Sequence, residues 1–265
     1  MAKKRINSYR ITNLPKQKDR ISLALGLLGL GAMLETFEKI AEENIKNHRT
    51  FYDYLESLCD IECGSREDNR LTLAELKARF PFTASFESYD FSLPRKIDKS
   101  LLQELKSCRF IEKGENVLFF GNPGVGKTHL AISLARESVR NGYTIKFIKL
   151  RKLIDEIGMS LDDDALHNLN ISLFKPDLLI IDEMDLYQTT PTAATFLSKV
   201  IQDRYEEEKS IIITSNKPHT AWEEVFGDKA RAGAIVDRLF HRVSFVIIES
   251  DSYRMLDNLK RQRIS

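Results

Sequence analysis

The chain has 265 residues, of which 42% are hydrophobic and 30% charged, and its formal net charge is +1. This length suits one α/β domain with a smaller companion, and the composition is that of a soluble globular protein. The near-zero net charge excludes a uniformly basic surface, so any nucleic-acid site has to be a local patch.

The first twenty residues, MAKKRINSYRITNLPKQKDR, form an arm with seven Lys or Arg residues and one Asp. Such an arm is a candidate contact for the phosphate backbone of DNA. The alternative is a solvated, partly disordered terminus, which is common for charged tails. The candidate DNA-binding residues in this arm are Lys3, Lys4, Arg5 and Arg10.

An apolar stretch follows at residues 21–34. It is too short to cross a bilayer, and Glu35 follows at once, so we expect no membrane association and a cytoplasmic location. Its apolar spacing continues as far as Ile45 and predicts a helix that packs into a small core. Further helical patterns cover residues 50–62, with Thr50 as the expected N-cap, and residues 70–80.

Two prolines and several aromatic residues break the helical pattern just after residue 80, as at a crossing between domains. We therefore expect a helical N-terminal domain with its basic arm at residues 1–80, which binds DNA or a partner, and a second domain at residues 81–265. The second domain has five apolar runs of strand length, most of them separated by helical stretches, which predicts a parallel α/β sheet. These runs cover residues 116–120, 143–150, 177–182, 210–215 and 243–249.

The segment GNPGVGKTH follows the first of these runs and opens a helix. It fits the pattern G-x-x-x-x-G-K-[ST], in which glycines let backbone N–H groups point at phosphates, the lysine reaches the β- and γ-phosphates, and the hydroxyl helps to hold Mg²⁺. ATP and Mg²⁺ are therefore the expected cofactors. The candidate nucleotide-binding residues are Gly121, Asn122, Pro123, Gly124, Val125, Gly126, Lys127, Thr128 and His129.

Two further strands deliver polar residues to the edge of the sheet where ligands of parallel α/β proteins bind. Asp182 ends one strand and is the expected second partner of Mg²⁺, together with Thr128. Glu183 follows it, and a carboxylate there can orient and polarise an attacking water, which favours ATP hydrolysis over phosphoryl transfer to a bound acceptor. Asn216 ends the next strand, where its amide could hold the same water.

Arg231, Arg238 and Arg242 are expected on one helix before the last strand. An arginine that reaches the γ-phosphate of a neighbouring copy would stabilise the charge that develops during hydrolysis, and it would make assembly depend on ATP. We expect Arg238 in this role; the alternative is an ordinary intramolecular or surface ion pair. Arg254, beyond the last strand, is a further candidate contact to the nucleotide.

The order of GNPGVGKTHLAISL, DLLIIDEMD, IIITSNKPHTAWEEVFGD, AIVDRLFHR and SYR resembles IstB, the AAA+ ATPase helper of insertion-sequence transposition, over nearly the whole chain. The resemblance implies an α/β AAA+ P-loop core with a five-stranded parallel sheet at residues 81–265, preceded by a small helical domain. It also implies a homo-oligomer that assembles on double-stranded DNA with ATP and presents the site to an IstA-like transposase. About fifteen residues follow the last strand, so the AAA+ lid is expected to be reduced or absent.

The resemblance makes Lys127 and Thr128 the Walker A pair, Asp182 and Glu183 the Walker B pair, and Asn216 the sensor-1 residue. Arg238 would be the arginine finger and Arg254 a sensor-2 candidate. Basic residues should line the DNA-facing side, and Lys149, Arg151 and Lys152 are candidates besides the arm, with a solvated helix start as the alternative. Two other functions stay open at this stage: a DnaC-like replicative helicase loader and a stand-alone small-molecule kinase.

Overall fold

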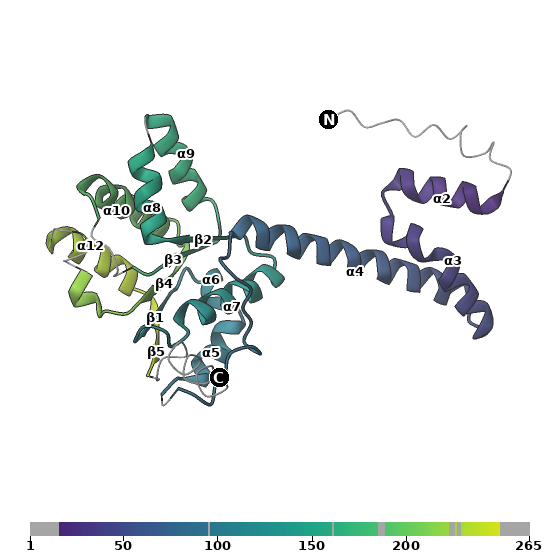
Figure 1. Cartoon of the computed structure of the whole chain (residues 1–265), viewed down its shortest axis with the longest axis horizontal. Coiled ribbons are helices and arrows are strands. Elements are labelled where there is room, and N and C mark those ends of the chain that lie inside the picture. The colour runs from purple at the N-terminus through teal and green to yellow at the C-terminus, as the bar shows by residue number, and fades with distance from the viewer. Residues whose placement is uncertain are drawn as a thin grey trace, which may run out of the picture. The chain divides into compact units, whose positions relative to one another are not determined.

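The structure is a computed structural model that describes residues 16–94, 96–160, 162–184, 189–222, 226 and 229–249 (Figure 1). The chain divides into two compact units, which meet between Thr72 and Leu73. No helix within these described ranges is long and apolar enough to cross a membrane.

The first unit begins with helices α2 (Gln17–Leu28) and α3 (Gly31–Lys46), where the apolar spacing had predicted one helix. That expectation was wrong because Gly29 ends α2 in the left-handed conformation, with a φ of 69°, and its N–H donates to the carbonyl of Gly26. Glycine reaches this conformation without the steric cost that a side chain would add. Ile45 is also not part of a core, since 77% of its surface is exposed.

Glu62, which lies on a third helix, bonds to the start of α3. Its Oε2 atom accepts hydrogen bonds from the backbone N–H groups of Ala32 and Met33 at the start of α3, at 3.0 and 3.2 Å. Its Oε1 accepts from Arg66, which also donates to the carbonyl of Gly29. A carboxylate at this position satisfies N–H groups that have no partner within a helix and complements the positive end of the helix dipole.

The third helix of this region, α4 (Phe51–Ala78), spans the boundary between the units. It joins the two helical patterns at residues 50–62 and 70–80, because the polar residues between them include no proline that would end a helix. Thr50 caps it as expected: its hydroxyl accepts from the N–H of Asp53 at 3.2 Å, and the Asp53 carboxylate accepts in return from the N–H of Thr50 at 2.7 Å.

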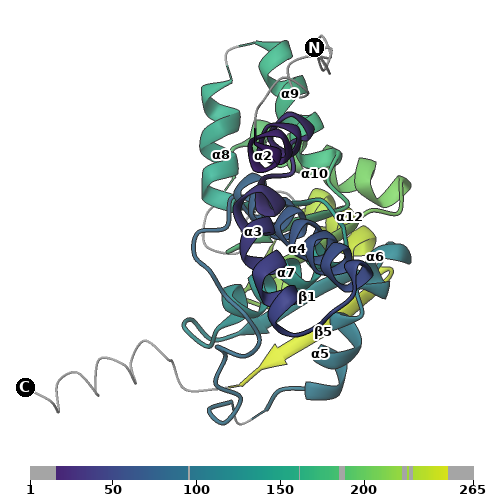
Figure 2. The ribbon, with the colours of Figure 1, turned by 90° about the vertical axis from the view of Figure 1, so that its right-hand side faces the viewer.

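The second unit is built on a five-stranded parallel sheet, as expected for an AAA+ core. Its strands are β1 (Asn116–Gly121), β2 (Ile145–Lys149), β3 (Leu178–Asp182), β4 (Ser210–Ser215) and β5 (Val243–Ile248). Each lies within two residues of the apolar run that predicted it. The strand order is β2-β3-β4-β1-β5, so β5 forms one edge of the sheet (Figure 2).

Helices cover both faces of this sheet (Figure 1). One face carries α8 (Leu150–Met159), α9 (Asp163–Phe174), α10 (Pro191–Glu206) and α12 (Lys229–Phe240), which share a buried core with Leu118, Ile181 and Ile213 of the strands. The other carries α5 (Lys99–Lys106), α6 (Arg109–Glu112) and α7 (Lys127–Arg140), and α7 contacts four strands. The sheet is therefore buried between two helical layers, as parallel sheets are.

Arg204 of α10 is a fully buried guanidinium that holds the connection from α9 to β3 at the amino edge of the sheet. It donates to five backbone carbonyls at 2.7–3.2 Å, which belong to Leu173, Phe174, Pro176, Asp177 and Ser210. Burial lowers its pKa to about 9, so it is still charged at neutral pH. A cation beside the last carbonyls of α9 also complements the negative end of that helix.

We expect Arg204→Met to lower the free energy of unfolding of the second unit by about 3 kcal/mol, because several buried carbonyls lose their donor at once. Urea unfolding followed by fluorescence measures this, since Trp222 is the sole tryptophan and is buried in this unit. Arg140→Met, which removes an exposed pair with Glu137, is the control and should cost less than about 1 kcal/mol. Equal losses in the two variants would contradict the role of Arg204.

Candidate nucleotide site

The predicted phosphate-binding loop connects β1 to α7 and can be formed only with glycine at two positions. Gly126 precedes α7 with a φ of 92°, and a Cβ there would lie 2.5 Å from the ring of Tyr89. A Cβ on Gly121 would lie 2.3 Å from the carbonyl oxygen of Ile248. Among the residues that the structure describes, no side chain caps the start of α7. Its first N–H groups and the positive end of its dipole thus suit an anion, so the loop fits the phosphates of ATP.

The segment before the sheet holds this loop in place. The Tyr89 hydroxyl donates to the carbonyl of Val125 at 3.0 Å, and the Tyr89 and His129 rings pack 5.7 Å apart. His129 Nε2 lies 2.9 Å from the carbonyl oxygen of Ser85. A carbonyl oxygen can only accept, so this nitrogen carries the proton. Among the predicted loop residues, Val125 and His129 therefore bond to the protein around the loop.

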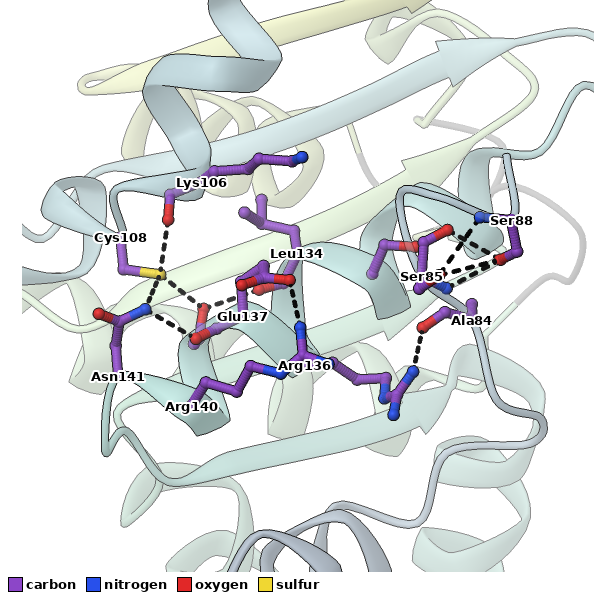
Figure 3. A network of polar contacts seen from close by, with 12 residues as sticks. Ala84, Ser85, Ser88, Lys106, Cys108, Leu134, Arg136, Glu137, Arg140 and Asn141 are labelled. Atoms are coloured by element: carbon purple, nitrogen blue, oxygen red, sulfur yellow. Dashed lines mark hydrogen bonds and ion pairs between the residues drawn. The ribbon is translucent and has the colours of Figure 1, made fainter. Parts of the chain in front are cut away.

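Arg136, about two helical turns after Lys127, anchors α7 through its side chain. Its guanidinium donates to the carbonyl of Ala84 at 2.8 Å (Figure 3) and forms an ion pair of 2.7 Å with Glu75 of α4. Both contacts are partly buried, and Ala84 itself is buried. The helix that begins with Lys127 is thereby anchored to the chain that enters the second unit.

Lys127 is buried, and its ammonium group meets three oxygen atoms. It donates to the carbonyls of Gly121 and Asn122 at 2.8 and 2.9 Å and to Oδ1 of Asn216 at 2.7 Å. The structure thus brings together Lys127 and Asn216, two of the residues singled out from sequence. A phosphate oxygen is the same kind of acceptor and could replace any of these three.

Asp182 is fully buried at the end of β3. Its Oδ1 accepts from the hydroxyls of Thr128 and Thr214, at 2.7 and 2.6 Å, and its Oδ2 has no hydrogen-bond partner among the described residues. Burial raises the pKa of this carboxyl, and the two hydroxyl bonds act in the opposite direction. A hydroxyl and a carboxylate with a spare oxygen are hard ligands of the kind Mg²⁺ prefers, so the residues fit that ion.

Glu183 follows Asp182 in the left-handed region, with a φ of 61°. Its carboxylate accepts from Lys149 Nζ at 3.2 Å, and the same ammonium lies 3.9 Å from Oδ2 of Asp182. Lys149 is the last residue of β2 and stands opposite Asp182 in the register of the two strands. Lys149 therefore lies beside the candidate site and pairs with both of its acidic residues.

The other basic residues predicted to contact DNA have acidic neighbours on their own helix. Arg151 pairs with Asp155 at 3.2 Å and Lys152 with Glu156 at 3.9 Å, both at i,i+4 spacing on α8; all four side chains are exposed except that of Glu156, which is partly buried. Such pairs are weak and do not prevent a contact to DNA. The four candidates in the basic arm, Lys3, Lys4, Arg5 and Arg10, lie outside the described residues.

The three arginines expected on one helix do not share it. Arg231 and Arg238 belong to α12, whereas Arg242 lies in the turn after it, because the helix ends at Phe240. Arg242 pairs with Glu208 at 3.0 Å. Arg238 donates to a carbonyl of its own helix at 2.8 Å and forms no ion pair with a described residue. The side chain of Arg231 and the whole of Arg254 lie outside the described part of the chain.

Sequence reasoning missed Thr214 and Tyr89 as parts of this site. The alternation of side chains along a strand puts Thr214 and Asn216 on the same side of the chain, and this was the one available signal for Thr214. Tyr89 lies in a loop 32 residues before Gly121, and no local pattern connects the two.

Comparison with known proteins places this site in a family. The family model for the IstB-like ATP binding protein matches residues 23–261. A protein of insertion sequence IS5376 from Geobacillus stearothermophilus, named for ATP binding, is 32% identical over 90% of this chain and 94% of its own length. Its counterpart of insertion sequence IS21 from Pseudomonas aeruginosa is 33% identical over 84% of each chain.

Two solved structures share the fold. The crystal structure of the DnaC helicase loader superposes with a TM-score of 0.50 at 20% identity, over 63% of this chain and 97% of that one. The crystal structure of DnaI gives a TM-score of 0.54 at 19% identity, over 66% and 93%. Identities this low show a common fold alone. The chain itself belongs to the family of IstB-like ATP binding proteins.

We expect Asp182→Asn to raise the melting temperature of the protein without nucleotide at pH 7 by a few degrees, because it removes a buried charge. The gain should shrink as the pH falls. The pKa of Asp182 is raised, so the wild type takes up a proton there at a higher pH than an ordinary aspartate and loses the cost of that charge. Melting followed by Trp222 fluorescence measures both effects.

Asp177→Asn is the matched control, since Asp177 also accepts from a threonine but is only partly buried. It should bring no gain in melting temperature. A lower melting temperature for Asp182→Asn at pH 7 would contradict the interpretation that the buried charge of Asp182 destabilises the folded protein.

Proposed function

We propose that this chain is an ATP-dependent DNA-binding regulator of transposition. With ATP bound it assembles on duplex DNA and assists a transposase in target selection, and ATP hydrolysis releases it. The domain at residues 81–265 is the ATPase, and residues 1–80, with the basic arm, contact DNA or a partner. Membership of the IstB-like family supports a role in transposition, because the two relatives described above belong to insertion sequences.

The observation that carries the ATPase part of the proposal is the convergence of three elements on one edge of the sheet. Lys127 bonds to Asn216, and Thr128 bonds to Asp182, so residues from α7, β3 and the end of β4 meet within hydrogen-bond distance. A P-loop ATPase needs these groups together: a cation for the phosphates, oxygen ligands for Mg²⁺ and polar groups for water.

Each residue of the candidate site has its own role in ATP binding and hydrolysis. Lys127 exchanges one of its oxygen partners for a phosphate oxygen, and the N–H groups at the start of α7 bind the phosphates. Thr128 and Asp182 would hold Mg²⁺, which when bound supplies positive charge beside the phosphate oxygens. Glu183 and Asn216 orient the attacking water, with Glu183 as the group that polarises it.

Arg238 is the residue we assign to a neighbouring copy's γ-phosphate. A finger that acts between copies needs a guanidinium that its own chain leaves available, and this supports Arg238 over Arg242, which pairs with Glu208. Because the finger stabilises charge in the neighbour's site, assembly and hydrolysis depend on each other. Loss of the γ-phosphate removes what Arg238 binds, so the assembly on DNA loosens.

The function is tested by binding to two unrelated DNA duplexes, measured by fluorescence anisotropy at two salt concentrations with ATP, with ADP and without nucleotide. We expect binding that requires ATP, differs little between the sequences and falls steeply with salt, because backbone contacts release counterions and carry little base information. Glu183→Gln should then remain on both duplexes long after the wild type has hydrolysed its ATP and dissociated.

Glu207→Gln is the control for that variant, because it makes the same change in charge on an exposed residue three positions before β4 begins. It should dissociate like the wild type. Salt-insensitive binding to one sequence, equal coating without nucleotide, or rapid dissociation of Glu183→Gln in ATP would each contradict the proposal.

We also expect Arg238→Ala to bind ATP normally but to hydrolyse it about 1,000-fold more slowly on DNA, as for other arginine fingers. Arg242→Ala is the matched control and should keep most of the activity. A mixture of Arg238→Ala with Lys127→Ala should recover part of the loss, since the second variant still supplies Arg238 to its neighbour. Steady-state ATPase assays on duplex DNA measure all three, and full activity of Arg238→Ala would reject the assignment.

A further inference from the structure

Thr214 lies on the strand next to the candidate acids, and its hydroxyl is shared between them. The side chain is 1% exposed. Its Oγ1 donates to Oδ1 of Asp182 at 2.6 Å and accepts from the backbone N–H of Glu183 at 2.9 Å. An ionised carboxylate can only accept, so the hydroxyl proton points at Asp182 and the oxygen lone pairs are left for Glu183. One hydroxyl therefore links two consecutive residues of the site.

The backbone of Glu183 departs from the regular hydrogen-bond pattern between β3 and β4, so its N–H group needs another acceptor. The pairing of β3 with β4 ends at Ile181 and Ile213. Beyond it Glu183 turns into the left-handed region, at a φ of 61°, which is strained for a residue with a side chain. The N–H of Glu183 bonds to the Thr214 side chain, and the N–H of Met184 bonds to the Thr214 carbonyl at 3.0 Å. Thr214 thus stabilises the turn through both its side chain and its backbone.

The same hydroxyl also fixes the position of the Asp182 carboxylate. Thr128 and Thr214 both donate to its Oδ1, at 2.7 and 2.6 Å, and Oδ2 has no hydrogen-bond partner among the described residues. Removing the Thr214 hydroxyl would leave Oδ1 with one of these two donors, so the direction of Oδ2 would be less well fixed.

We propose that Thr214 is a positioning residue for ATP hydrolysis. Its hydroxyl sets the Asp182 carboxylate and the Glu183 backbone in a fixed relation to each other, and so aligns the ligand of the cation with the group that orients water. This inference rests on the proposed ATPase function and adds to it a residue that touches neither nucleotide nor water. Residues that position ligands from behind in this way typically change affinity or activity about 10- to 100-fold.

The test compares Thr214→Val, which keeps the branched shape but loses the hydroxyl, with Thr214→Ser, which keeps the hydroxyl. Thr214→Val should bind a fluorescent ATP analogue without Mg²⁺ within about threefold of the wild type, while its kcat falls about 10- to 100-fold. Thr214→Ser should recover most of the kcat, because it restores the hydroxyl that bonds to Asp182 and Glu183.

The chain offers a matched control at the opposite edge of the sheet. The Thr144 hydroxyl donates to the carboxylate of Asp177 at 2.7 Å and accepts from its N–H at 3.1 Å, so it makes the same two kinds of bond far from the acids of the site. Thr144→Val should leave kcat unchanged. Should Thr214→Val fail to fold, as judged by Trp222 fluorescence, Thr214→Ala replaces it with the same expected result.

The possible outcomes distinguish a failure of this inference from a failure of the proposed function on which it rests. Wild-type protein that does not hydrolyse ATP on DNA would refute the proposed function. If the wild type does hydrolyse ATP, an unchanged kcat in Thr214→Val would overturn the role of Thr214 alone. So would a loss that Thr214→Ser fails to recover, because the effect would then not belong to the hydroxyl.

Discussion

A charged carboxylate inside the protein, that of Asp182, is the constraint that organises the second unit. Burial of an unpaired charge is costly, so its neighbours have to supply compensating donors. Three elements do so: α7 brings the Thr128 hydroxyl, β4 brings the Thr214 hydroxyl and β2 brings the Lys149 ammonium. This works only because β3 lies between β2 and β4 in the sheet and faces α7. The order of the strands is thus tied to the chemistry of one side chain.

Lys149 links this constraint to the expected DNA contact. From sequence it was a candidate for the DNA-facing side; in the structure it ends β2 and pairs with Glu183. An ammonium group has three protons, so a DNA phosphate would share the charge and the donors of Lys149 with Glu183. A contact of Lys149 with DNA would therefore change the surroundings of the residue proposed to orient water. Arg151 and Lys152 are different, since both are exposed and form only weak i,i+4 pairs within α8.

The sequence predicted the features that depend on local patterns, and these the structure confirmed: five strands from five apolar runs, the glycine loop before α7 and the cap at Thr50. It misjudged α2 and α3, because a single left-handed glycine outweighed a continuous apolar spacing. It could not give the bonds of Thr214, Tyr89 or Lys149, whose partners lie between 31 and 36 residues away. Such contacts follow from strand order and register, which no local pattern encodes.

A threonine–aspartate pair occurs at each edge of the sheet, and its role depends on the edge at which it lies. Thr144 with Asp177 and Thr214 with Asp182 make the same hydroxyl–carboxylate bond, at 2.7 and 2.6 Å. At the amino edge the pair connects the starts of two strands, and both terminal nitrogens of the nearby cation, Arg204, donate to backbone carbonyls. At the carboxyl edge the positive end of α7 and the ammonium of Lys127 face the same space. A parallel sheet points all of its strand ends, and the start of the following helix, at that edge, so phosphate chemistry is supported there and not at the other.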